Sequence, residues 1–513
     1  MESDKTFSKT IPPPVLGWNT KDPISQMNPL YSPGIENYFP GNGVVALRNG
    51  YTQHVKTNIA NGYFHLDELV NNAGTHFLIA FTGGNGDIYN VTSAGTGTQI
   101  TGGFLTQSAE NYTVNFRSKL YCKGYSSAAN SDMLACDGTA ATRPAFTGPG
   151  GDDKDLWRLT TYKGRLYALT ISDASMWYGA FEATTGAMSQ YDFQSLLVLG
   201  GKPWYIGSFS MTGGDITQEY FCMISEQGEV LLFQGDSPDD TTWYLTSHFF
   251  IPAPVGRKSF FKWGSDILIV TYEGLVSLRE YIGTPAGEDY TFLSDNIASE
   301  FKSAVAASVA YSASNFIQGI VYPKGQYLLV NFPLEVASNA GAVQFVMNTQ
   351  TRAWTKFSGQ AANAWSLLNN ALYWAGSVIS SLNGYVALAD NGDKDVDPTD
   401  SSLTLSRTTK LRFAFNYLDK PEQTKILTEC VPIVYESENL SLTLNADVDY
   451  SDNTATSANP TTGDTSYKLY ATTRCGLKAD PGKAVSIRMD GTVSTKRRSI
   501  QAVEVFWREG GTR

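Results

Sequence analysis

The fold is decided by HFLIAFTGGNGDIYNV at residues 76–91, where two short apolar runs flank a glycine-rich turn. β-Branched and aromatic residues favour strands, and a Gly/Asn cluster between two such runs is typical of a hairpin. Six further copies of the first run, HFLIAF at 76–81, follow at intervals of 44 to 60 residues. They are KLYCKG at 119–124, RLYALT at 165–170, YFCMIS at 220–225, DILIVT at 266–271, YLLVNF at 327–332 and ALYWAG at 371–376.

The second run, GDIYNV at 86–91, recurs in the same order. Its copies are DMLACDG at 132–138, SMWYGA at 175–180, GEVLLFQG at 228–235, EGLVSL at 273–278, VQFVMN at 343–348 and GYVALAD at 384–390. A small sheet repeated at this spacing is the pattern of β-propeller blades, because radial stacking buries both faces of each sheet. The repeat predicts an all-β propeller of about seven blades, within a range of six to eight.

The ends of the chain lie outside the repeat. Residues 1–50 are rich in Pro and Asn and predict an extended arm with turns. After the acidic loop DNGDKDVDPTDSS at 390–402, segments such as LSLTLNADVDY and QAVEVFWRE alternate apolar and polar residues. This period-two pattern predicts a β-sandwich-like or open antiparallel domain. We therefore expect an arm over 1–50 that joins a platform domain over 396–513, with the propeller over 51–395.

Composition agrees with a β protein, with 42% hydrophobic and 12% aromatic residues and 47 Gly. The net charge of −11 disfavours a protein that clamps nucleic acid, since such proteins carry a basic footprint. Simple solubility and an acidic wall past which DNA slides both remain open. The five cysteines are scattered and lack metal or disulfide spacing, which favours free thiols. The opening MESDKTFSKTIPPP has no apolar signal segment, and no apolar run is long enough for membrane insertion.

No motif points to catalysis, a cofactor or a metal, so no catalytic, cofactor-binding or metal-ligating residue is expected. The four histidines, His54, His65, His76 and His248, do not pair at metal-ligand spacing. The GGNG segment at 83–86 fits a turn better than a phosphate cradle, since no helix pattern follows it. SPDDTTW at 237–243 faintly resembles the Asp-box turn of sialidases but lacks its glycine, so a structural turn is expected.

Three charged groups each allow two interpretations. Asp390, Asp393, Asp395 and Asp397 either gather oxygens for calcium or form a solvated interdomain loop, and the second is favoured. The same holds for Asp152, Asp153 and Asp155. The basic run of Lys496, Arg497 and Arg498 either protects an edge strand or contacts an acidic partner.

One stretch of the N-terminal arm, GWNTKDPISQMNPLYSPGIENYFPGNGVVALRNGY at 17–51, resembles the opening of tail nozzle proteins of short-tailed bacteriophages. The matching positions are Gly17, Asn19, Asp22, Pro23, Met27, Pro29, Asn37, Phe39, Pro40, Arg48, Gly50 and Tyr51. Three later stretches are similar to this family in the same order. They are VLLFQGDSPDDTTWYL at 230–245, PVGRKSFFKWGSDILIVTYEGLVSL at 254–278 and MNTQTRAWTKFSGQAANAWSLLNNALYWAG at 347–376.

The resemblance implies a structural virion protein, made in the bacterial cytoplasm and located in the tail. Such subunits form a ring, usually a hexamer, below the head-tail adaptor ring, and tail fibres or spikes and a distal plug dock nearby. Double-stranded DNA passes through the channel during ejection without specific binding, and the resemblance carries over no catalytic residue. A net negative bore, to which acidic loops such as 390–400 contribute, is our hypothesis for that channel. Two alternatives stay open, a propeller-type glycan-degrading enzyme and a receptor-binding tail module.

Overall fold

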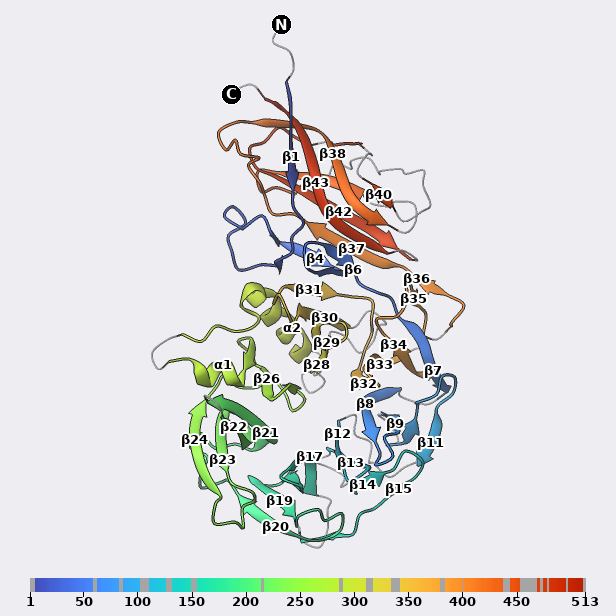
Figure 1. The fold of residues 1–513 in the computed structure, drawn as a ribbon, viewed down its shortest axis with the longest axis vertical. Helices are drawn as coiled ribbons and strands as arrows, with labels where there is room; N and C mark the ends of the chain where they lie inside the picture. The colour runs from blue at the N-terminus through green and yellow to red at the C-terminus, as the bar shows by residue number, and fades with distance from the viewer. Residues whose placement is uncertain are drawn as a thin grey trace.

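The computed structural model describes residues 5–58, 62–82, 86–101, 110–125, 132–148, 155–213, 216–285, 289–310, 317–333, 342–378, 383–398, 400–436, 443–452, 468–470, 474–477, 479–494 and 497–510. The molecule is elongated, with a propeller at one end and a smaller platform at the other (Figure 1). Both termini emerge from the end of the platform that lies farthest from the propeller.

Seven blades form the ring of the propeller, and the inner strands, such as β8, β12, β17 and β32, face its centre (Figure 1). Blade one is β8 (Tyr63–Val70), β9 (His76–Thr82), β10 (Ile88–Asn90) and β11 (Thr98–Thr101). Blade two is β12 (Asn111–Phe116), β13 (Lys119–Gly124), β14 (Leu134–Cys136) and β15 (Ala141–Thr142). Blade three is β17 (Leu156–Tyr162), β18 (Arg165–Thr170), β19 (Ser175–Gly179) and β20 (Gly186–Asp192), with β16 (Phe146–Thr147) added at its outer edge.

Blade four is β21 (Pro203–Gly213), β22 (Ile216–Ser225), β23 (Glu229–Gln234) and β24 (Tyr244–Phe250). Blade five has three strands, β25 (Phe260–Trp263), β26 (Asp266–Val270) and β27 (Leu275–Ser277), and the chain then enters helix α1 (Leu278–Gly283). Blade six is β28 (Gln318–Tyr322), β29 (Tyr327–Pro333), β30 (Ala342–Asn348) and β31 (Trp354–Phe357). The last blade is β32 (Ala364–Leu368), β33 (Ala371–Val378) and β34 (Asn383–Leu388), completed by β7 (Thr52–Asn58).

Each hairpin that the sequence predicted forms the second and third strands of a blade, which confirms the predicted propeller. The hydrophobic cores lie between neighbouring blades rather than within them. Leu69 and Ile79 of blade one, for example, pack in one cluster with Leu120 and Cys122 of blade two. This is the burial by radial stacking that makes a repeated sheet stable. Because β7 pairs with β34 across more than 300 residues of chain, the ring is closed by strands from its two ends.

The platform consists of two packed sheets. One contains β4 (Gly34–Glu36), β37 (Arg407–Arg412), β42 (Val485–Val493) and β39 (Thr443–Val448). The other contains β38 (Lys425–Glu436), β43 (Arg498–Glu509), β6 (Val45–Leu47), β5 (Tyr38–Pro40), β1 (Thr6–Ile11), β40 (Lys468–Tyr470) and β41 (Cys475–Gly476). Buried Leu444, Ile487 and Met489 of the first share a core with Val503 and Val505 of the second. The fold class is thus all-β, a propeller with a β-sandwich-like platform.

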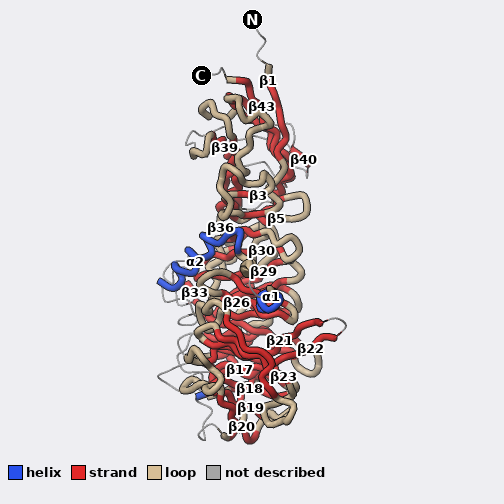
Figure 2. Tube along the Cα trace, turned by 90° about the vertical axis from the view of Figure 1, so that its left-hand side faces the viewer, coloured by secondary structure: helices blue, strands red, loops and turns tan. Residues whose placement is uncertain are grey.

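One sheet runs through both parts of the molecule. The outer strand of blade six, β31, pairs in parallel with β4, and β4 pairs with β37 of the platform, giving a sheet of ten strands. The short β2 (Gly17–Trp18) and β3 (Tyr31–Ser32) join its side. The turn η2 (Asp295–Ile297) leads into helix α2 (Ala298–Ala310), which packs on this sheet through Phe301. Its ring meets Phe332 edge-on and Phe345 at a tilt. Figure 2 shows α2 on the flank of the molecule beside blade six. Shared backbone hydrogen bonds and a shared core therefore make the junction part of the fold.

Candidate functional sites at the junction and in the propeller centre

The junction between platform and propeller contains a buried ion pair. The guanidinium of Arg48 donates to both carboxylate oxygens of Asp395, at 3.0 and 2.6 Å, and the two side chains are 1% and 2% exposed. Asp395 lies in β35 (Asp395–Val396), which pairs with β36 (Thr404–Leu405). A second guanidinium, that of Arg407, lies 3.8 Å from the same carboxylate. A bidentate pair of this kind has strong geometric specificity, so it fixes the loop to the arm.

Asn37 extends this network. Its backbone has φ of +60°, its side-chain amide donates to Ser358 and to the carbonyl of Thr408, and its side-chain oxygen accepts from Arg48 at 2.8 Å. Asn tolerates the left-handed region better than most residues because its short amide hydrogen-bonds locally. One arm residue thus connects blade six to β37 of the platform.

The acidic loop at 390–397 is only partly the solvated loop expected from its sequence. Asn391, Gly392 and Lys394 are exposed, but Asp395 is buried in an ion pair. Asp393 pairs with Arg497, and Asp390 accepts from Asn49 and Tyr327. Within the described parts of the chain, no group of three or more His, Cys, Asp or Glu side chains could hold a metal ion.

The basic run near 497 divides into one exposed and one buried cation. Arg497 pairs with Asp393 with its side chain 60% exposed, while Arg498 is 2% exposed and donates to the hydroxyl of Tyr38. An edge strand is wrong for this run, because β43 is paired with β38 on one side and with β6 on the other. A contact of Arg497 with an acidic partner stays a prediction. Lys496, Asp152, Asp153 and residues 83–85 of the GGNG segment lie outside the described residues, while Asp155 accepts a hydrogen bond from Ser172.

The SPDDTTW segment is a turn between β23 and β24, as predicted. Asp240 accepts from the amide and hydroxyl of Thr242, and Trp243 stacks on Phe233 at 5.2 Å between ring centroids. All five cysteines are buried free thiols.

Three of the four histidines contact carboxylate or backbone carbonyl oxygens. His76 pairs with Glu68 and His248 pairs with Glu229, both at 2.7 Å. His54 contacts the backbone carbonyls of Val91 and Thr92.

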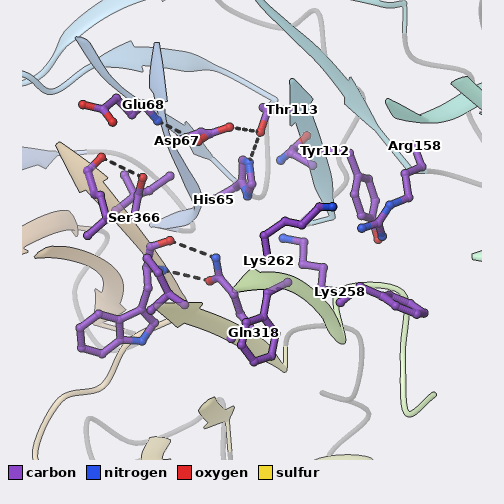
Figure 3. Close-up of a pocket in the computed structure, with 18 residues that line it drawn as sticks. His65, Asp67, Glu68, Tyr112, Thr113, Arg158, Lys258, Lys262, Gln318 and Ser366 are labelled. Atoms are coloured by element: carbon purple, nitrogen blue, oxygen red, sulfur yellow. Dashed lines mark hydrogen bonds between the residues drawn. The ribbon is translucent and has the colours of Figure 1, made fainter. Parts of the chain in front are cut away.

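The propeller centre holds a cavity of about 520 Å³, lined by inner strands of six blades or the loops that lead into them. Three cations come from its blade-three and blade-five side, Arg158, Lys258 and Lys262, and face polar groups of blades one and two (Figure 3). The sequence analysis did not single out these cations. A signal was available, because a charged side chain among apolar neighbours on the first strand of a blade points toward the centre.

Two of the cations, Arg158 and Lys262, are held in place by specific contacts. Arg158 donates to the carbonyls of Trp204 and Arg257, and its guanidinium lies 4.7 Å from the ring centroid of Tyr205. Lys262 donates to the backbone carbonyl of Ser208. Burial lowers the pKa of Lys262 and of Arg158. The pKa of Lys258 falls to about 8, mainly through burial and also through the charge of Arg158, while Glu110 opposes the change.

The opposite wall carries a hydrogen-bonded chain of three side chains. The hydroxyl of Thr113 donates to Asp67 at 2.5 Å, and Nε2 of His65 lies 2.9 Å from the same hydroxyl (Figure 3). Because the hydroxyl proton is directed to Asp67, His65 acts as donor to Thr113. Burial raises the pKa of Asp67 and lowers that of His65 well below its usual value. The Thr113 hydroxyl is thus held between Asp67 and His65.

The molecule thus belongs structurally to the β-propellers, extended by a platform. No family model matches the sequence, and no curated protein matches it. Solved structures similar to it include two crystal structures of BBS1N in complex with ARL6DN, one soaked with mercury and one with lead. Their identities are 10%, their TM-scores 0.39 and 0.37, and each alignment covers 67% of this chain and 97% of the other. At these values the neighbours say nothing about what this chain binds. No helix in the described segments has the length and apolar character needed to cross a membrane.

Proposed function

We propose that this chain is a structural subunit of a tail nozzle ring, through which a short-tailed bacteriophage ejects its DNA. The observation that carries the proposal is the position of the residues on which the family resemblance rests. Gly17, Asn37, Arg48 and Gly50 all lie at the junction of propeller and platform. A Cβ on Gly17 would lie 2.5 Å from the carbonyl oxygen of Trp354 in blade six, and one on Gly50 would lie 2.0 Å from the carbonyl oxygen of Lys394.

The architecture supports this role physically. A ring subunit with an outward module must transmit force between the module and the ring without bending at the connection. Here a ten-stranded sheet and a buried ion pair make that connection, and strands from both chain ends build the platform. β1 pairs with β43 along its whole length, for example from Thr6 to Arg508 and from Ile11 to Val503. The arm and the C-terminal strand thus form one surface element, which suits a platform that contacts neighbouring copies.

Apolar side chains that follow the propeller in the chain are also exposed, where a partner copy would cover them. Leu403 and Leu405, beside and in β36 at the junction, are 52% and 37% exposed, and Ile426 in β38 of the platform is 40% exposed. Interfaces that persist in assemblies have apolar centres, so exposed apolar side chains are candidates for them. In the proposed assembly these residues lie at the contacts between adjacent subunits. The assembled ring contacts the adaptor ring above it, and the tail fibres or spikes and the distal plug dock nearby.

The mass of the purified protein in solution tests the proposal. A nozzle subunit should form a closed ring of several copies of the 55.9 kDa chain. The family resemblance implies six copies. Ile426→Lys should dissociate the ring, because a lysine at a contact must give up its hydration. The matched control is Val198→Lys on the propeller, at a side chain 73% exposed, which should leave the mass unchanged. A monomer at every concentration, or dissociation by the control alone, would count against the proposal.

The enzyme alternative makes a different demand. Glycan hydrolysis needs two carboxyl groups flanking one bond, roughly 5 to 9.5 Å apart. The carboxylates along the propeller cavity, Asp67 and Glu68, are both engaged, Asp67 by Thr113 and Glu68 by His76 and the amide of Asn369. Incubation of the purified protein with capsular and lipopolysaccharide glycans, read by release of reducing ends, separates the two functions. The nozzle proposal expects no turnover.

A further inference from the structure

The propeller cavity brings together cations from two blades. Arg158 comes from β17 of blade three, while Lys258 and Lys262 come from the segment that enters and forms β25 of blade five. Blade four lies between them in sequence, so the chain travels about 100 residues to place these charges on one cavity. Like charges gathered in a partly buried space repel, and this arrangement costs folding free energy unless an anion is present.

The carboxylates that act on these cations, Glu110 on Lys258 and Glu219 with Asp266 on Lys262, lie outside the cavity lining. Arg158 and Lys262 hydrogen-bond to backbone carbonyls of Trp204, Arg257 and Ser208, which carry partial charge only. Glu110, which approaches this side of the cavity, forms a bidentate pair with Arg257 at 2.6 and 2.8 Å. Its charge is therefore shared with a cation outside the lining.

Two carboxylates, Asp67 and Glu68, line the cavity together with the three cations. Glu68 pairs with His76 on its own blade. Asp67 accepts from Thr113 and from a backbone amide, and burial raises its pKa, which reduces the negative charge it carries. The remaining polar groups of the far wall, such as Gln318 with its two hydrogen bonds to the backbone of Trp365, are uncharged.

We propose that this cavity binds a small ligand carrying an oxyanion, with the phosphate or carboxylate group held by Arg158, Lys258 and Lys262. Guanidinium and ammonium groups recognise such anions through charge-assisted hydrogen bonds. The cavity volume of about 520 Å³ is in the range of small-molecule sites, and it exceeds what an isolated phosphate fills. The ligand therefore has a neutral body that extends toward Thr113 and Ser366. The site does not depend on the nozzle role, since it lies in one propeller and needs no second copy.

Calorimetric titration of the intact chain at low salt tests the inference with three probes. Inorganic phosphate reports the anion alone, glucose 6-phosphate adds a neutral body, and glucuronate replaces the phosphate by a carboxylate. We expect saturable binding with one site per chain, tighter for one of the two larger probes than for phosphate, and weaker in high salt. Preference for glucose 6-phosphate assigns a phosphate ligand, and preference for glucuronate assigns a carboxylate ligand.

Variants connect the binding to these side chains. Lys262→Met should raise the dissociation constant of the preferred probe by roughly tenfold or more, as expected for loss of a hydrogen bond to a charged group. Lys262→Arg, which keeps the charge, should retain binding, and the exposed Lys324→Met should have no effect. Unchanged thermal unfolding of each variant shows that the fold is intact. Absence of saturable binding for all three probes, or equal binding by Lys262→Met and the parent chain, would overturn the inference.

Discussion

The buried pair of Arg48 and Asp395 allows a sharp test of how platform and propeller are joined. Replacing Arg48 by Met removes the bidentate contact at 3.0 and 2.6 Å and leaves Asp395 at 2% exposure. The nearest remaining cation is Arg407, at 3.8 Å. The carbonyl of Ser358 also loses the Arg48 donor, and the side-chain oxygen of Asn37 keeps only the backbone amide of Ser358.

The magnitude follows from burial. Removing one partner of a buried pair costs about 3–5 kcal/mol, because an uncompensated charge stays in a low-dielectric site. The Arg48→Met variant should show this loss. The double variant Arg48→Met with Asp395→Leu should recover part of it, since no buried carboxylate is left without its partner. The exposed pair of Lys302 and Glu273, at 50% and 54% side-chain exposure, provides the control. Lys302→Met should cost less than about 1 kcal/mol.

Urea unfolding followed by tryptophan fluorescence measures these differences, with limited proteolysis as a second readout. Because platform and propeller can unfold separately, the midpoints of each transition are compared instead of one global free energy. We expect Arg48→Met to lower the midpoint and to expose the segment near residue 395 to protease. A loss no larger than that of Lys302→Met would refute the view that this pair holds the junction.

Three further results are expected. Gly50→Ala should destabilise the chain by about 1–3 kcal/mol in chemical denaturation, since its Cβ would lie 2.0 Å from a loop carbonyl, whereas Gly34→Ala has open space and should be nearly neutral. Lys258, which faces Glu110 and Arg158, has a pKa lowered to about 8, so above pH 8 the unfolded chain binds the extra proton. The parent chain should therefore gain stability relative to Lys258→Met as pH rises from 8 toward 10.5, and a flat difference in unfolding free energy would contradict this. The five buried thiols should react with Ellman's reagent after denaturation only, and a fast-reacting thiol in the native protein would show that its strand is exposed.

The sequence predicted what local chemistry determines. Alternating apolar residues and Gly/Asn turns specify hairpins within about 20 residues, so the second and third strands of each blade were found from their pattern. The closing strand β7 was not identified as part of a blade, because TQHVKTN at 52–58 carries few apolar residues and finds its partner β34 far along the chain. The sequence also did not predict that blade five has three strands. The segment after β27 is long enough for a fourth strand, but it forms helix α1 and a loop instead.

Electrostatic surroundings were the least predictable feature. A run with Asp390, Asp393, Asp395 and Asp397 has the composition of a solvated loop, and its burial depends on Arg48, 347 positions away. The burial of Arg498 was missed for the same reason, since its partner Tyr38 lies 460 positions away. The cavity cations could be found only once the closed ring was known, because the sequence of one blade does not show which residues of other blades line the same central cavity. Long-range pairing, and not residue type, decides whether a charge is solvated, paired or available to a ligand.

The central claim, that this chain is a subunit of a tail nozzle ring, is tested most directly by imaging particles that carry it. Antibody fragments raised against the propeller would mark its position in averaged electron micrographs of the virions. We expect the label in a ring around the tail axis, below the adaptor, with one fragment per subunit and the platform toward the axis. Label on an off-axis fibre alone, or no label on any particle, would contradict the claim.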